Sequence, residues 1–231
     1  MGAQERRHSE SSGLVQIITR GGGQQALTVT AIYVWVTNFA ANTVSRINDA
    51  ATKVVDKLWL GTRPAAIASG PSGVWVANSD DGTIQRIDLL TGEPDNPVPV
   101  GAGPDGIAVG DDSVWVANGR DGTVSRFDPK TVQDLSSPIA VGSGPKGIAV
   151  SGGEVWVANQ LDESVTRINV STLVPRPIFV GEGPTSVAVA GGAVWVSEEF
   201  AGLLTRIDPA TNVPQRFWFG SSPPGPAAAD G

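Results

Sequence analysis

The side chains best suited to binding or catalysis in this 231-residue chain stand in short, glycine-rich segments between apolar runs. They combine acidic, basic, amide and aromatic groups, a mixture that can hold a small molecule or a peptide in a concave surface. The alternative for each of them is the ordinary variation of a solvated loop. The residues that we predict to form a binding surface are Phe39, Asp80, Asp105, Arg120, Lys146, Gln160, Glu198, Glu199 and Phe200.

Groups that commonly carry enzymatic catalysis are scarce in the sequence. The chain has no cysteine and a single histidine, His8, which stands in a polar N-terminal stretch. A nucleophile activated by a neighbouring histidine therefore has no basis in this sequence. The Gly-x-Gly-Pro segments precede apolar, strand-like runs, whereas a phosphate-binding loop opens a helix. We predict no catalytic residues, and the sequence favours a protein that is not an enzyme.

Two acidic turns superficially resemble pieces of a calcium-binding loop. Asp80-Asp81-Gly82 and Asp121-Gly122 supply carboxylates, but no run of alternate ligands ending in a glutamate follows them. The absence of cysteine excludes metal sites built from thiolates. The prediction is therefore that the chain holds no metal and no cofactor.

A repeat of about 40 residues carries these turns. Tryptophans at positions 35, 75, 115, 156 and 195 are spaced by 40, 40, 41 and 39 residues. Each stands in a Val-Trp-Val segment, and four of the five segments end in asparagine, as Val114–Asn118 does. The fifth copy ends in Glu198 instead. A fixed period of this length indicates an array of one supersecondary unit.

The third copy shows the unit most clearly. Short apolar runs at 107–109, 114–117, 123–128 and 138–141 are separated by segments rich in glycine, proline and aspartate. Each run is too short and too sharply bounded for a helix, and the Asp121-Gly122 pair is a hairpin signal. Four short antiparallel strands in about 40 residues are the blade of a β-propeller. The predicted fold is therefore an all-β propeller of four-stranded antiparallel blades.

The sequence leaves two possibilities for the number of blades in the ring. Five complete repeats are visible, residues 14–19 (LVQIIT) read as a preceding fourth strand, and residues 220–225 read as the opening of a further turn. The chain is either a closed five-bladed ring or a fragment of a six- or seven-bladed ring. We expect a disordered polar tail over 1–13, the propeller over 14–225 and a flexible tail over 226–231.

The residues that repeat are best explained by architecture. The five tryptophans are predicted to fill the gaps between neighbouring blades, because identical positions in all copies favour packing over binding. Arginines recur at positions 46, 86, 126, 167 and 206. We predict that they tie blades together through carboxylates or backbone carbonyls. Because successive strands alternate in direction, the turns before the first strand and after the second lie at one end of each blade, where the candidate residues gather.

The segments GxGPxGIAV, VWVAN and DGTVxRID together resemble the bacterial YVTN-type propeller repeat. They are also similar to the repeat of the streptogramin B (virginiamycin B) lyase family, in which a W-x-T/S-E strand follows a Gly-Pro turn. The resemblance covers roughly residues 14 to 225. For the lyase family it implies a histidine near a glutamate, with a magnesium ion, at one mouth of the ring. Glu198 matches the glutamate, and His8 lies outside every repeat, so the histidine role has no counterpart.

The predicted function is a non-enzymatic binding or scaffold module. One alternative is a degenerate, magnesium-dependent C–O lyase for a cyclic depsipeptide or lactone, and another is a spacer in a multidomain bacterial sensor. A net charge of −7 without a long basic run argues against nucleic acid, and no apolar run is long enough to span a membrane. The expected partner is a small molecule, a peptide or a protein, or other domains of a longer chain. The first residues lack a signal-peptide pattern, so a cytoplasmic location is the default expectation.

Overall fold

The computed structural model describes residues 24–48 and 54–218. Its described residues form twenty strands and one short 3-10 turn, η1 (Phe39–Ala41). The chain divides into two compact units, Met1–Pro99 and Val100–Gly231. The expected tails, the expected strand at 14–19 and the expected turn at 220–225 lie outside the described residues. Among the described residues, no helix is long and apolar enough to cross a membrane.

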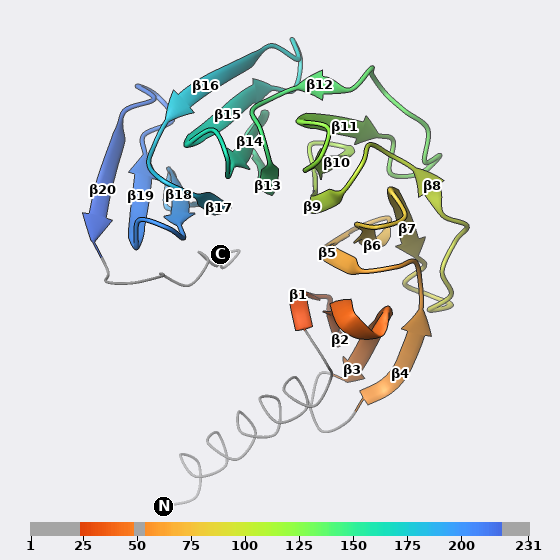
Figure 1. Cartoon of the computed structure of the whole chain (residues 1–231). Coiled ribbons are helices and arrows are strands. Elements are labelled where there is room, and N and C mark those ends of the chain that lie inside the picture. Colours follow the sequence, from red (N-terminus) through yellow and green to blue (C-terminus); the bar gives the residue numbers. More distant parts are fainter. Residues whose placement is uncertain (1–23, 49–53, 219–231) are drawn as a thin grey trace, which may run out of the picture. The chain divides into compact units, whose positions relative to one another are not determined.

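The first unit contains two four-stranded sheets (Figure 1). Their strands, in chain order, are β1 (Gln24–Val29), β2 (Tyr33–Asn38), β3 (Thr43–Asn48) and β4 (Val54–Trp59), then β5 (Pro64–Gly70), β6 (Gly73–Asn78), β7 (Thr83–Ile87) and β8 (Val98–Pro99). Neighbouring strands are antiparallel in every pair, so each sheet is a simple meander.

The second unit contains three sheets of the same kind. Their strands are β9 (Pro104–Gly110), β10 (Ser113–Asn118), β11 (Thr123–Phe127) and β12 (Ile139–Ala140), then β13 (Pro145–Ser151), β14 (Glu154–Asn159), β15 (Ser164–Asn169) and β16 (Pro175–Phe179), and last β17 (Pro184–Ala190), β18 (Ala193–Glu198), β19 (Leu203–Ile207) and β20 (Pro214–Trp218). The described residues thus confirm the predicted propeller of four-stranded antiparallel blades, with five such blades.

The first strand of each blade begins earlier than the sequence indicated. Residues 104–106 were expected in a turn, but β9 starts at Pro104 and pairs with β10 from there, with a register shift between Ala117 and Asn118. The bulge absorbs one extra residue and keeps the apolar side chains on the correct face. Asp105 and Lys146 therefore lie at the starts of strands β9 and β13, not in the turns before them.

Three of the five tryptophans, Trp35, Trp115 and Trp156, pack against the following blade, as predicted. Trp115 is fully buried and packs in one cluster with Val155, Val157 and Ile168 of the following blade. In the same way, Trp156 packs with Val194 and other residues of the blade after its own. Each of these three rings contributes a large apolar area to an inter-blade core, which accounts for its recurrence without any binding role. Trp195 is only half-buried and lies against Phe217 of its own blade.

A glycine in the first strand permits neighbouring blades to approach closely. A Cβ atom on Gly106 would overlap the backbone carbonyl oxygen of Lys146, and one on Gly147 would stand 2.6 Å from the carbonyl oxygen of Thr185. Strands β9, β13 and β17 therefore pack backbone to backbone along this line. Any side chain there would force the blades apart.

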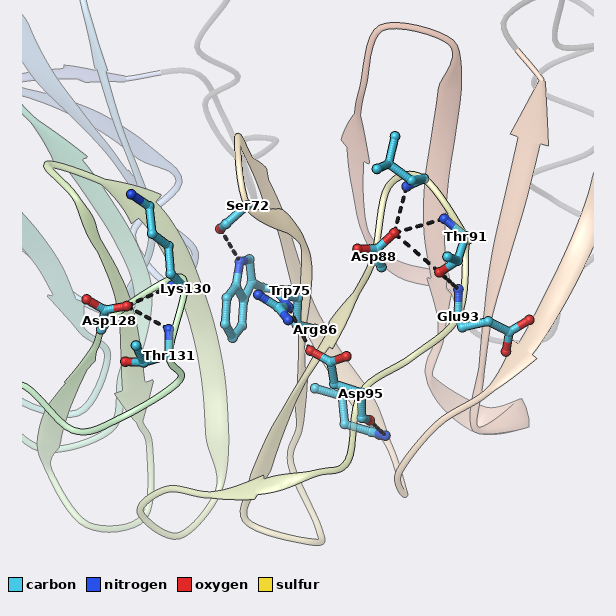
Figure 2. A network of polar contacts seen from close by, with 12 residues as sticks. Ser72, Trp75, Arg86, Asp88, Thr91, Glu93, Asp95, Asp128, Lys130 and Thr131 are labelled. Carbon is cyan, nitrogen blue, oxygen red and sulfur yellow. Dashed lines mark hydrogen bonds and ion pairs between the residues drawn. The ribbon is translucent and has the colours of Figure 1, made fainter.

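Two of the repeated arginines tie neighbouring blades together, which confirms the prediction for Arg126 and Arg167. Arg46 and Arg86 instead pair with acids of their own blades. In the first unit, Arg86 donates to the Asp95 carboxylate at 2.7 Å (Figure 2). In the second unit, Arg126 donates to the backbone carbonyl of Val170 at 3.2 Å, and Arg167 donates to that of Pro209 at 2.6 Å. The guanidinium groups also lie over the tryptophan rings, with Arg126 4.8 Å from the ring of Trp115.

An aspartate follows three of the repeated arginines by two residues and closes the turn after its own strand. Asp88 accepts hydrogen bonds from the backbone N–H groups of Leu90 and Thr91, both at 2.8 Å (Figure 2). Asp128 does the same for Lys130 and Thr131. These carboxylates close their own turns, because a short acidic side chain can accept from the backbone two and three residues ahead.

Candidate functional site

Two sets of turns meet at one end of the second to fifth blades, as the alternating strand direction predicts. The backbone N–H of Gly119 donates to Gly103 at 2.7 Å, and that of Glu199 donates to Gly183 at 2.8 Å. We call this end the turn face. Its segments are 39–42, 60–63 and 79–82 in the first unit, and 100–103, 119–122, 142–144, 160–163, 181–183 and 199–202 in the second.

An aspartate side chain adds a second hydrogen-bonded link between the two turns of a blade. The carboxylates of Asp81, Asp121 and Asp162 accept from the backbone N–H groups of Thr62, Ala102 and Ser143, each at 2.6 Å. These acids are therefore engaged in holding the turns, which explains them without calcium. The fifth blade carries Ala201 at this position and lacks this hydrogen bond.

A buried amide ends the second strand in the first four blades. Asn118 is fully buried and its Nδ2 donates to Thr123 Oγ1 at 3.1 Å and to Ser125 Oγ at 2.9 Å. Asn159 makes the same pair of bonds with Ser164 and Thr166. The repeated asparagine thus ties the second strand to the third from inside the blade.

Glu198 takes this buried position in the fifth blade, and its placement corrects the sequence-based prediction. It was expected at the surface, but its exposed fraction is 0%. Its Oε1 accepts from the Thr205 hydroxyl, while Oε2 is buried without a hydrogen-bond partner among the described residues. A Cβ atom on Gly181 would overlap this oxygen, so the carboxylate lies directly beneath the turn. Glu198 is therefore not a surface contact.

Phe39 and Asp80 come together in the first unit through a residue that the sequence analysis missed. The guanidinium of Arg63 stands 4.3 Å from the centre of the Phe39 ring, and its Nη1 lies 3.2 Å from Asp80 Oδ1. The Arg63 side chain is 45% exposed. A signal was present: Arg63 stands in Gly-Thr-Arg-Pro, where three later repeats have Gly-x-Gly-Pro.

The remaining predicted residues lie on the turn face of the second unit. Asp105 is half-buried with its carboxylate close to Gly119, and the Arg120 side chain runs along Gly103. Phe200 is 63% exposed and covers Gly183 in the same manner. Each of these side chains lies over a glycine, and a larger residue in place of that glycine would displace it.

One pair of predicted residues bridges two blades of the second unit. Gln160 Nε2 donates to Glu199 Oε2 at 3.4 Å, and both side chains stand at the surface. Lys146, at the start of β13, is half-buried. The turn face of this unit therefore presents both signs of charge beside an exposed aromatic ring.

The donor set at Glu198 does not fit a magnesium site. Magnesium needs near-octahedral oxygen coordination, with carboxylates reaching it from different elements. Within residues 24–48 and 54–218, no group of three histidine, cysteine, aspartate or glutamate residues is placed to hold a metal ion. Among the described residues, Glu198 is the one acid whose side chain is buried. We therefore derive no reaction step through a metal.

Solved structures with the same fold include enzymes. A catalytically inactive virginiamycin B lyase from Staphylococcus aureus with quinupristin is 21% identical, with a TM-score of 0.76 over 86% of this chain and 71% of that chain. A streptogramin B lyase is 18% identical, with a TM-score of 0.74 over 87% and 70%. Hydrazine synthase from Kuenenia stuttgartiensis is 17% identical, with a TM-score of 0.75 over 85% and 66%.

Sequence comparisons add no closer relative: no known family of sequences matches the chain, and no curated protein does. The structural likeness confirms the expected resemblance to streptogramin lyase-like propellers at the level of the fold. A lyase and a hydrazine synthase match this chain about equally well, so the fold is compatible with unrelated activities. Function has to be argued from the residues of the turn face.

Proposed function

We propose that this chain is a non-enzymatic binding module whose turn face holds a peptide or a small molecule. The observation that carries the proposal is Arg63, which departs from the repeat and presents a half-exposed guanidinium between an aromatic ring and a carboxylate. Exposed residues of this kind, set on a rigid scaffold, are typical of recognition surfaces.

The backbone at Arg63 supports a role in binding. Its φ angle is +55°, and the glycines at the equivalent positions of later blades, Gly103 and Gly144, have φ angles of +62° and +63°. A side chain in this left-handed conformation costs about 1–2 kcal/mol. Strain of this kind is concentrated at functional sites, where the surrounding structure tolerates it. An arginine kept in a glycine position is therefore a good candidate for contact with a ligand.

The chemistry around Arg63 suits a peptide. The guanidinium lies over the Phe39 ring, and an aromatic or planar amide group can stack on this pair. Asp80 is 32% exposed and supplies carboxylate acceptors beside this pair. A ligand with both donors and acceptors, such as a peptide backbone, can satisfy both charges at once.

A peptide library displayed on phage and selected against the whole chain tests this proposal. We expect selected peptides, remade synthetically, to lose about tenfold or more in affinity for Arg63→Gly and Asp80→Ser, as the loss of a charged hydrogen bond implies. Lys57→Ala, an exposed cation on β4 of the same unit, is the matched control and should bind normally. Selection of no peptide contradicts the assignment to a peptide, and equal binding of selected peptides by all variants contradicts the role of Arg63 and Asp80.

Stability measurements on Arg63→Gly separate a binding role from a structural one. Relief of backbone strain favours the variant, while loss of an exposed ion pair and a cation–π contact, with the greater freedom of glycine in the unfolded chain, opposes it. The free energy of unfolding should therefore stay within about 1 kcal/mol of the parent. A loss well above that value assigns Arg63 to the scaffold.

A second candidate function is a lyase activity, favoured by Glu198. This buried carboxylate replaces the repeated asparagine and leaves one oxygen without a partner among the described residues. The lyases of similar fold give the substrate to try, since one of them was solved with quinupristin.

Liquid chromatography with tandem mass spectrometry decides between the two functions, because ring opening by C–O elimination leaves the mass unchanged. The whole chain is incubated with quinupristin and magnesium chloride, and a linear product is sought. We expect no product. Ring opening that Glu198→Gln abolishes, in a variant with unchanged circular dichroism, overturns the non-enzymatic proposal.

A further inference from the structure

The second unit contains a polar pocket at the end of the blades away from the turn face. Its volume is about 640 Å³, and it lies between the start of β14, the hairpin of β15 and β16, and the turn before β20. The residues that line it are Glu154, Arg167, Asn169, Thr172, Val174, Arg176, Pro209, Ala210 and Asn212. We call it the Arg176 pocket. None of its residues belongs to the predicted binding surface.

The charge of this pocket departs from the pattern of the first unit. There the repeated arginine pairs with an acid near the fourth strand: Arg46 lies 3.3 Å from Asp56, and Arg86 lies 2.7 Å from Asp95. On β15 and β16, the residue directly across from Arg167 is Arg176. Two cations facing each other on neighbouring strands destabilise a sheet unless something compensates them.

Protein groups compensate Arg167. Its Nη1 donates to Pro209 O at 2.6 Å and to Asn212 Oδ1 at 2.8 Å, and its Nη2 donates to Glu154 Oε1 at 3.1 Å. Asn169 Nδ2 also donates to Glu154 Oε1, at 3.2 Å. The guanidinium of Arg167 is therefore fixed in place as one wall of the pocket.

Glu154 is ionised at neutral pH and balances one of the two cations. Burial raises the pKa of this carboxyl, but the hydrogen bonds from Arg167 and Asn169 outweigh burial and lower its pKa overall. One carboxylate faces two guanidinium groups, and the remaining polar groups of the pocket are neutral amides and a hydroxyl. The pocket thus carries one uncompensated positive charge.

Arg176 is the source of that charge. Its side chain is exposed, and it forms no hydrogen bond or salt bridge with any residue that the structure describes. Val174, Pro209 and Ala210 add apolar surface to the same pocket. A free guanidinium beside apolar carbon is suited to a ligand that joins an oxyanion to a small hydrocarbon group, because the planar fork matches a carboxylate.

We propose that the Arg176 pocket binds the carboxylate of a small organic acid, with Arg176 as its main partner and Arg167 as the fixed second cation. The site is independent of the binding function proposed for the turn face. Inorganic oxyanions share the charge but lack the apolar part, so the two kinds of anion can be told apart by titration.

The test is a nitrogen-15 NMR titration of the whole chain with sodium benzoate at constant ionic strength set by chloride. We expect saturable shifts at Arg167, Arg176 and Asn212. Benzyl alcohol, which keeps the ring and lacks the charge, should give none. Sodium phosphate is the second arm, and tighter binding of phosphate than of benzoate contradicts the assignment to an organic acid.

Two substitutions and a control complete the test. Arg176→Gln should weaken benzoate binding by about tenfold or more, since it removes the charged partner. Arg176→Asp restores the acid of the first unit opposite Arg167 and should abolish binding. Arg216→Gln, at an exposed arginine on β20 outside the pocket, should bind as the parent does. Equal benzoate affinity in the parent and in Arg176→Gln, with both folded, overturns the proposal.

Discussion

The two ends of the blades use repetition in opposite ways. At the turn face the backbone bonds repeat, as in the pairs Gly119–Gly103 and Glu199–Gly183, while the side chains above them vary. At the other end a side chain repeats, the arginine of the third strand, and its partners vary from acids to carbonyls. Where the backbone supplies the framework, the side chains can vary from blade to blade. Where a side chain supplies it, a change of partner can leave a charge uncompensated, as at Arg176.

The largest expected effect tests the framework that both ends share. Trp115→Ala should lower the free energy of unfolding by about 3–5 kcal/mol, because it leaves a cavity in the core between two blades. Trp59→Ala removes a ring that is 74% exposed and should cost less than about 0.5 kcal/mol. Urea unfolding measures both. A cost below about 1 kcal/mol for Trp115→Ala would refute the inter-blade packing.

An intermediate effect is expected where the fifth blade departs from the others. Glu198→Gln restores an amide that can donate to the Thr205 hydroxyl, as Asn159 donates to Thr166 at 2.8 Å. It also removes a buried carboxylate oxygen without a partner among the described residues. We expect a gain in unfolding free energy of about 1 kcal/mol. Asn159→Asp makes the converse change in the fourth blade, and stabilisation by both variants would contradict the comparison.

The smallest expected effect is on the stability of the fold at acidic pH. Backbone N–H groups of Thr91 and Leu90 lower the pKa of Asp88, and those of Thr131 and Lys130 lower the pKa of Asp128. Because the folded pKa lies below the unfolded one, this contribution is present above the unfolded pKa and is lost as the pH falls through the folded pKa. The double variant Asp88→Asn, Asp128→Asn should therefore show a shallower loss of stability below about pH 4. NMR titration that places either pKa above its usual range contradicts this.

The sequence was sufficient for everything that depends on period and alternation. The tryptophan spacing predicts the blades, and the glycine and proline positions predict their turns, because each blade solves the same packing problem with the same local residues. The inter-blade roles of three tryptophans and of two repeated arginines follow from the same regularity. Strand starts such as Pro104 were missed, because a bulge is set by pairing rather than by local sequence.

Side-chain direction and partner choice depended on tertiary structure. A glutamate in a polar turn reads as a surface group, yet Glu198 is buried, because its position in the blade is an interior one that the other repeats fill with asparagine. Arg63 stands far in the chain from Phe39 and Asp80. Arg176 stands where the first unit has an acid opposite the repeated arginine. Only folding brings Phe39, Arg63 and Asp80 together, and only strand register sets Arg176 across from Arg167. Period is a local property of the chain, whereas charge balance is a property of the neighbours that folding supplies.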